Sequence, residues 1–150
     1  MPGALQRYAA ELEAPLSAGG VSPGTFRLIS SRSPWHTHTL TQDLYPEGDS
    51  RRRVTLLISA EDARELGFHD GDEAFAESAK GKIRVVLETS ARLRRGVLRG
   101  QYGWGTSPDI LRSPLEGAYN LNELTDADAL DPATGDACFG DLTVTLRPAE

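Results

Sequence analysis

The chain has 150 residues, of which 39% are hydrophobic and 25% charged, a composition that is typical of one globular domain and excludes a disordered or fibrous protein. Its formal net charge of −6 argues against a general attraction to nucleic acid, so an anionic ligand would need local positive charge. No apolar run approaches the roughly 20 residues that span a bilayer, the start does not resemble a secretory signal, and a single cysteine excludes an internal disulfide. We therefore expect a cytoplasmic protein, unless the chain is a fragment whose targeting signal lies elsewhere.

The first part of the chain divides into a lead-in and a folded module. Residues 1–24 end in a Ser/Gly/Pro-rich stretch, so we expect a linker there and one domain over residues 25–150. A mostly apolar run over 26–30 predicts the first strand. The nearly continuous apolar run VTLLIS, residues 54–59, predicts a second strand that is buried.

A short helix is predicted directly after the second strand. Ser59 is a good N-cap, and Asp62 three residues later would complete a capping box. Gly67 is placed to end the helix in the left-handed conformation. The sequence HDGD that follows predicts a turn in which Gly71 takes a positive φ.

The remaining strands are short and separated by turn residues. Residues 73–78 and 83–88 alternate in polarity around the turn Lys80-Gly81, which predicts a hairpin. Further strands are predicted around 97–98 and over 142–147. Together with one or two short helices, this pattern indicates a mainly β chain that closes into a barrel.

Residues 100–136 contain little periodicity. A loop of that length in a compact domain usually has a function or docks on another surface. Trp104, which lies between two glycines, either packs in the interior or borders a binding pocket, and we favour packing.

The segment SSRSPWHTHTLTQ, residues 30–42, is the polar stretch with the richest chemistry. Arg32 offers a planar fork for phosphate, and Trp35 can stack on a ring. The Ser and Thr hydroxyls can bond to phosphate or sugar oxygens. An irregular polar loop anchored by one tryptophan explains the same residues, so both interpretations remain open at this point.

Four motifs occur in a specific order along the chain: SRSPWHTHT, SAEDARELGFHDGDEAFAESAKGKI, ARLRRGVL and YNLNELTDADALDPATGDACFGDLTV. This order resembles the molybdopterin-dinucleotide-binding domain, the C-terminal module of the family that includes formate dehydrogenases, nitrate reductases and dimethylsulfoxide reductase. The resemblance covers about residues 25–147. It implies a six-stranded double-psi β-barrel with one or two short helices.

The resemblance also implies a cofactor and its binding residues. The cofactor is molybdopterin guanine dinucleotide, carrying molybdenum or tungsten and shared with other domains. The implied binding residues are Arg32, Trp35, His36, Thr37, His38, Thr39 and Asn122, with Asn120 and Asp131 as weaker candidates. An Asn side chain has the paired donor and acceptor that suit a pterin or guanine edge. We therefore expect the early segment and Asn122 to meet in one cleft.

The chain also departs from the complete enzymes of that family. There the metal is held by the cofactor, often with a ligand from a different domain, and that domain is absent from this sequence. Cys138 does not match the metal-ligand position and is interpreted as a small buried hydrophobe. We therefore expect no catalytic residue and no turnover by the chain alone. The expected partner is a set of catalytic domains or a catalytic subunit, with no nucleic acid and no membrane insertion.

The sequence admits three other interpretations. His36 and His38 form a His-x-His pair, but zinc usually takes three or four protein ligands and His69 is the one further histidine, so no metal site is predicted. A stand-alone barrel serving as a protein-interaction or regulatory module without cofactor is the alternative, and the WHTHT segment argues against it. A barrel enzyme of the aspartate-decarboxylase type needs an internal Gly-Ser cleavage site, which the sequence lacks.

Overall fold

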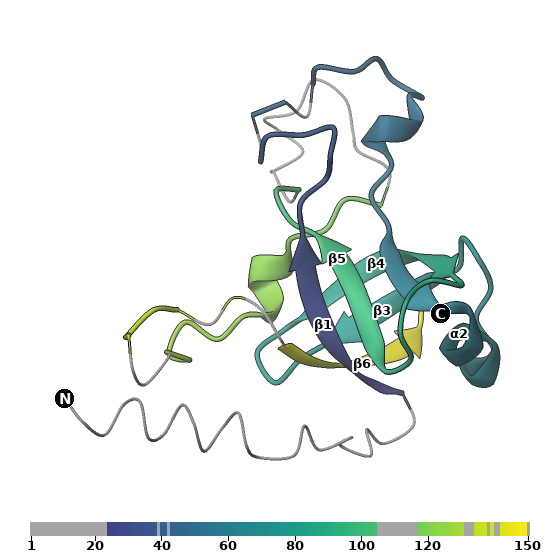
Figure 1. Cartoon of the computed structure of the whole chain (residues 1–150), viewed down its shortest axis with the longest axis vertical. Coiled ribbons are helices and arrows are strands. Elements are labelled where there is room, and N and C mark those ends of the chain that lie inside the picture. The colour runs from purple at the N-terminus through teal and green to yellow at the C-terminus, as the bar shows by residue number, and fades with distance from the viewer. Residues whose placement is uncertain are drawn as a thin grey trace.

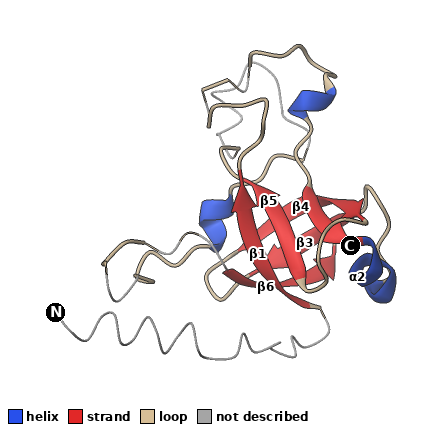
Figure 2. Cartoon of the chain, in the orientation of Figure 1, coloured by secondary structure: helices blue, strands red, loops and turns tan. Residues whose placement is uncertain are grey.

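The structure is a computed structural model, and it describes residues 24–38, 40–41, 43–104, 117–130, 134–137, 139 and 142–149. In this part of the chain six strands close into a barrel, with two 3-10 helices and one α-helix around it (Figures 1 and 2). The strands are β1 (Thr25–Ser31), β2 (Leu56–Ser59), β3 (Glu73–Glu77), β4 (Lys82–Ser90), β5 (Val97–Gln101) and β6 (Leu142–Pro148). The helices are η1 (Ser50–Arg52), α2 (Ala60–Leu66) and η2 (Leu121–Leu124).

The order of strands around the barrel is β1-β5-β2-β4-β3-β6, so neighbours in space are mostly not neighbours in sequence. β1 pairs with β5 in parallel, and so does β2 with β4, whereas the other four pairings are antiparallel. Two parallel pairs joined by crossing connections are the feature that the term double-psi describes. The prediction of a mainly β, six-stranded closed barrel is confirmed, and closure leaves no unpaired sheet edge.

The alternation in the sequence matches the two faces of the barrel wall. In β1, Phe26 and Leu28 point inward and are buried, while Arg27 between them is exposed. The centre of the core consists of side chains with no exposed surface, which include Leu56, Ile58, Leu87 and Leu98. β2 is shorter than predicted, because Val54 and Thr55 are buried but lie outside the strand ladder.

Helix α2 begins and ends as the sequence predicts. Ser59 is the N-cap, and its Oγ accepts the Asp62 N–H at 3.0 Å. Gly67 has a φ of +78°, the left-handed conformation that ends the helix. The second half of the predicted capping box is replaced by a longer-range contact. The Asp62 carboxylate accepts the Gly96 N–H at 2.7 Å and Arg95 Nε at 2.8 Å, and so ties α2 to the turn before β5.

η2 packs against the barrel wall and brings the late loop onto the core. Its Leu121 and Leu124 are buried, and a Cβ on Gly100 of β5 would lie 3.1 Å from Leu121. A Cβ on Gly81 would lie 2.2 Å from the Glu123 carbonyl oxygen, so the predicted hairpin turn needs a glycine to make room for η2. Among the residues that the structure describes, no helix has the length and apolar character needed to cross a membrane.

The buried Asp62 generates a prediction about stability and pH. Burial alone would raise the pKa of Asp62, but the hydrogen bonds from Arg95 and the Gly96 N–H outweigh it and lower that pKa below its usual 3.8. A carboxylate with a lowered pKa contributes stability above its unfolded-state pKa, and this stability is lost as the pH falls through the folded-state pKa.

We therefore expect Asp62→Asn to lower the free energy of unfolding by about 2 kcal/mol at neutral pH. The difference from the parent chain should shrink below about pH 4, measured by urea unfolding across that range. Glu61→Gln is the matched control, because the Glu61 side chain is 66% exposed and its contact with Arg95 is 3.8 Å long. Equal losses in the two variants, or a loss that does not change with pH, would contradict the assignment.

Candidate functional site

A long connection between β1 and β2, residues 32–55, forms a layer above one end of the barrel and is called the β1–β2 loop here (Figure 1). The chain that follows β5 packs into it. Trp104 is buried, as predicted, and its ring centroid lies 4.3 Å from that of His36. Gly103 has a φ of +91°, and a Cβ there would lie 2.9 Å from the backbone of His38. The two connections therefore touch closely, which holds the loop on the barrel.

A cavity of about 710 Å³ opens between the β1–β2 loop, the turn before β3 and the end of β4. Its volume lies within the range of about 300–1,000 Å³ that is usual for ligand sites. Its lining is rich in polar side chains, including Ser33, Thr55, Thr89 and Gln101. Trp35 lines the same cavity and is 55% exposed, an unusual state for a large aromatic side chain. This cavity is the candidate functional site.

Of the first two predicted binding residues, Trp35 lines the cavity and Arg32 does not. The backbone of Trp35 is held on both sides, because its N–H donates to Ser33 Oγ at 3.3 Å and its carbonyl accepts from the Tyr45 hydroxyl at 3.2 Å. Its indole stays exposed. Arg32 does not line the cavity; its side chain is exposed and its Nε donates to the Tyr102 hydroxyl at 3.0 Å.

His36 is buried within the β1–β2 loop and does not line the cavity. Its ring is buried and packs edge-on against Trp104 and Tyr45. Both ring nitrogens face carbonyl oxygens, Nε2 at 2.7 Å from Arg51 and Nδ1 at 3.3 Å from Thr41. Carbonyl oxygens only accept, so the shorter contact assigns a proton to Nε2. The ring holds the two ends of the loop together and does not face the cavity.

The residues after His36 return to the surface. Thr37 is exposed, and its N–H donates to Thr41 Oγ1 at 2.9 Å. His38 is exposed with a φ of +50°, and its ring centroid lies 5.5 Å from that of Tyr102. Thr39 lies outside the described residues. The His-x-His pair is therefore split between the interior and the surface, and among the described residues no group of three or more His, Cys, Asp and Glu is placed to hold a metal ion. Cys138 also lies outside the described residues.

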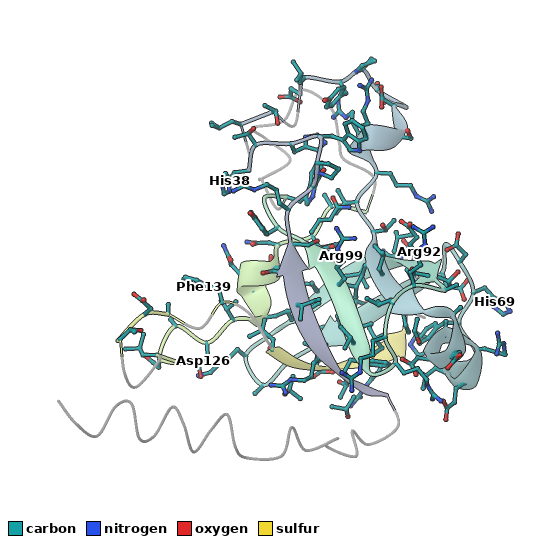
Figure 3. The ribbon with its side chains drawn as sticks, in the orientation of Figure 1. His38, His69, Arg92, Arg99, Asp126 and Phe139 are labelled. Atoms are coloured by element: carbon teal, nitrogen blue, oxygen red, sulfur yellow. The ribbon has the colours of Figure 1, made fainter. Side chains whose placement is uncertain are left out.

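The late part of the predicted site lies on η2. The Asn120 side chain accepts the Asn122 N–H at 3.1 Å and so caps η2, while the Asn122 side chain is exposed. Asp131 lies outside the described residues. Neither asparagine lines the cavity beside Trp35. In Figure 3, Asp126, which follows η2, lies well below His38 of the β1–β2 loop. This cavity therefore does not join the two predicted parts of the site.

Several residues that line the cavity are not among the binding residues predicted from the sequence. The triplet Arg51-Arg52-Arg53 is a visible signal, but a surface cluster explains it equally well. Arg51 Nε donates to Asp49 Oδ1 at 2.8 Å, and this contact lowers the pKa of Asp49 to about 2. Arg51 also lies over the Tyr45 ring at 3.9 Å, which adds a cation–π contact. Arg51 and Arg53 both line the cavity.

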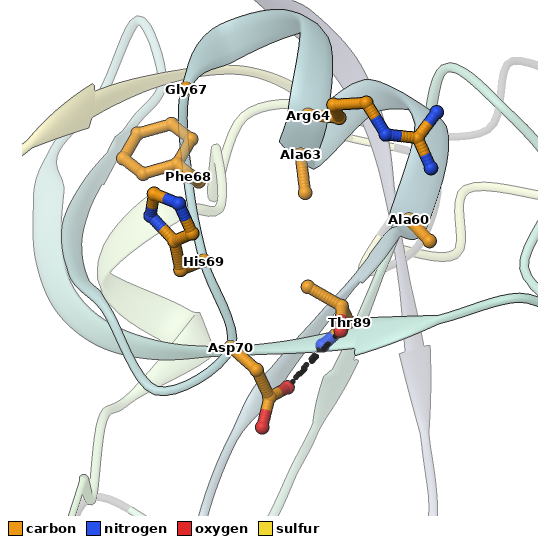
Figure 4. A pocket seen from close by; sticks show the side chains of 8 residues that line it. All are labelled: Ala60, Ala63, Arg64, Gly67, Phe68, His69, Asp70 and Thr89. Carbon is orange, nitrogen blue, oxygen red and sulfur yellow. Dashed lines mark hydrogen bonds between the residues drawn. The ribbon is translucent and has the colours of Figure 1, made fainter.

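A second, smaller hollow of about 300 Å³ lies beside α2 (Figure 4). Ala60, Ala63 and Phe68 give it an apolar wall. Asp70 and Thr89 belong to the linings of both hollows, and the Asp70 carboxylate accepts the Thr89 N–H at 2.7 Å. This hydrogen bond therefore forms part of the boundary between them.

A family model described as "Molydopterin dinucleotide binding domain" matches residues 26–143, most of the chain. The chain belongs to the molybdopterin dinucleotide-binding domain family. The resemblance drawn from the order of the four motifs is thus confirmed.

A solved structure shares the fold of this family member. Acetylene hydratase from Pelobacter acetylenicus is similar to 93% of this chain with a TM-score of 0.69 and 19% sequence identity. At that identity the likeness shows the fold alone. The chain matches 20% of the length of that protein.

The different environments of the two loop histidines generate a prediction. We expect His36→Ala to lower the free energy of unfolding by about 2–3 kcal/mol, because the Arg51 carbonyl loses its donor and the buried ring leaves a void. His38→Asn should change it by less than about 0.5 kcal/mol, since asparagine tolerates a positive φ and the side chain is exposed. Urea unfolding of both variants tests this, and similar losses in the two would contradict the placement of His36.

Proposed function

We propose that this chain binds molybdopterin guanine dinucleotide as one module of a larger molybdenum or tungsten oxidoreductase, either its C-terminal domain or a small subunit. The observation that carries the proposal is the exposed Trp35 at the wall of a polar cavity, in a chain of this family. When bound, the cofactor supplies the redox chemistry through the metal that it carries. The chain contributes binding and orientation, and we expect no turnover from the chain alone.

The chemistry of the cavity suits a nucleotide-tailed pterin. The Trp35 indole is fixed through its backbone while its face stays open, so it is pre-arranged to stack on a planar ring. Hydroxyl and amide groups around it supply donors and acceptors for ring edges and sugar oxygens. A cavity with these groups is better suited to a polar aromatic ligand than to a purely apolar ligand.

We assign the remaining predicted residues that the structure describes according to where they lie. Arg32, Thr37 and His38 are proposed to contact the cofactor from the outer side of the β1–β2 loop, and His36 is proposed to position that loop. Asn122 and Asn120 are proposed to meet a different part of the same cofactor, beyond the cavity. For Thr39 and Asp131, which lie outside the described residues, a contact with the cofactor is proposed from the resemblance alone. A catalytic domain or subunit would complete the pocket between these two regions, which fits a module that spans a fifth of a larger structure.

Tryptophan fluorescence tests cofactor binding, because one of the two tryptophans is exposed at the cavity and the other is buried. Released molybdopterin guanine dinucleotide added to the chain should quench the Trp35 emission in a saturable way. Trp35→Phe should abolish the quenching, and Trp35→Ala should weaken binding, followed by calorimetry, about tenfold through loss of stacking.

The control is Ile29→Ala, which removes an exposed apolar side chain outside the cavity and should leave binding unchanged. The same variants are compared for cofactor content after co-expression with the catalytic polypeptide, which supplies the other wall of the pocket. Absence of cofactor from both the isolated chain and this complex would contradict the proposed function.

A second comparison tests whether the two separate regions bind one ligand. Arg32→Ala and Asn122→Ala should each lower the cofactor content of the complex, because each is proposed to contact the dinucleotide. Both side chains are exposed, so the free energy of unfolding should change by less than about 0.5 kcal/mol. A loss with Arg32→Ala alone would remove Asn122 from the site.

A further inference from the structure

The three consecutive arginines of the β1–β2 loop have three different environments. Arg51 is paired with Asp49 and stacked on the Tyr45 ring. The side chain of Arg52 is buried, and its Nη1 donates to the Tyr45 carbonyl at 3.0 Å. Both guanidinium groups therefore contact other residues of the same loop and stabilise its conformation.

Arg53 differs from both of its neighbours. It lines the large cavity and is exposed, and within the described part of the chain its guanidinium forms no hydrogen bond or ion pair. Its Nη2 lies 4.0 Å from the position of a Cβ on Gly71, so the group sits against the turn before β3. Five N–H donors are thus available at the cavity wall.

The two carboxylates of the cavity do not neutralise Arg53. Asp70 Oδ1 accepts from Thr89 N at 2.7 Å, and Glu88 Oε2 accepts from Thr55 Oγ1 at 2.6 Å. Both carboxylates accept hydrogen bonds from neutral donors. The guanidinium of Arg53 therefore forms no ion pair with either of them.

A second group of donors lies in the same cavity. Gln101 Oε1 accepts from the indole N–H of the buried Trp104 at 3.2 Å. This contact fixes the amide, so its NH₂ group remains as a donor. Gln101 and Arg53 both line the cavity, one from the end of β5 and one from the β1–β2 loop.

We propose that Arg53, assisted by the Gln101 amide, is the anion-binding position of this cavity and takes a phosphate of the bound dinucleotide. This rests on the proposed function. A guanidinium matches phosphate geometry with two parallel hydrogen bonds. In a chain with a net charge of −6 the overall field repels phosphate, so local, uncommitted donors must hold it.

Inorganic pyrophosphate is the probe, titrated into the full chain at constant ionic strength and followed by calorimetry. We expect saturable binding that Arg53→Gln weakens about tenfold or more. Arg92→Gln is the matched control, since Arg92 is exposed in the β4–β5 turn (Figure 3), lines neither hollow and should leave binding unchanged. Glu88→Gln should tighten binding a few-fold, because it removes a negative charge from the cavity while keeping an acceptor for Thr55.

Absence of pyrophosphate binding, or equal weakening by Arg53→Gln and Arg92→Gln, would overturn the inference. Urea unfolding shows whether the variants are folded. A titration with the complete cofactor distinguishes failure of this inference from failure of the proposed function. If the cofactor quenches Trp35 with the same affinity in Arg53→Gln and in the parent chain, the inference falls and the proposed function stands. If the cofactor fails to bind while pyrophosphate binding depends on Arg53, the proposed function falls and the cavity is a phosphate site for another ligand.

Discussion

The buried hydroxyl of Tyr119 joins the two backbone segments that frame the cavity. It accepts the Gln101 N–H at 2.9 Å and donates to the Thr55 carbonyl, also at 2.9 Å. Both residues line the cavity, so this one group sets the separation of its walls. Burial raises the pKa of Tyr119, which keeps the hydroxyl protonated and able to donate. Without it, the partly buried N–H of Gln101 at the end of β5 and the buried carbonyl of Thr55 just before β2 would lose this partner.

The cavity therefore depends on contacts between segments that are far apart in sequence. Tyr119 comes from the late loop, Trp104 from the chain after β5, and His36 from the β1–β2 loop. The barrel brings their attachment points together, because β5 lies between β1 and β2 in the strand order. Each of these aromatic or polar side chains then fills space that the strands alone leave open. The order of strands is thus the reason that one end of the barrel carries a site.

The sequence predicts the strands and α2 well because their signals are local. Alternation, a serine cap and a left-handed glycine act within a few residues, and they determine elements such as β4 and α2. The roles of polar side chains depend on distant partners. Asp62 has the spacing of a capping box, yet its carboxylate accepts the N–H of Gly96, which is 34 residues away in the turn before β5. Likewise, no local pattern distinguishes the buried Arg52 from the exposed Arg53, or the buried His36 from the exposed His38.

The WHTHT segment places a buried histidine, His36, directly after an exposed tryptophan, Trp35. An indole that is free to move would lose its exposed surface by folding back onto nearby apolar groups, because burial of aromatic surface is favourable. Here the chain is held on both sides of Trp35, at its N–H by Ser33 and at its carbonyl by Tyr45, while His36 next to it is packed under the loop. The ring of His36 fills the space against Tyr45 and Trp104 under the loop, while the indole of Trp35 stays exposed. The buried histidine and the two backbone hydrogen bonds thus anchor the segment that carries this exposed indole, the face on which we propose that a planar ligand stacks.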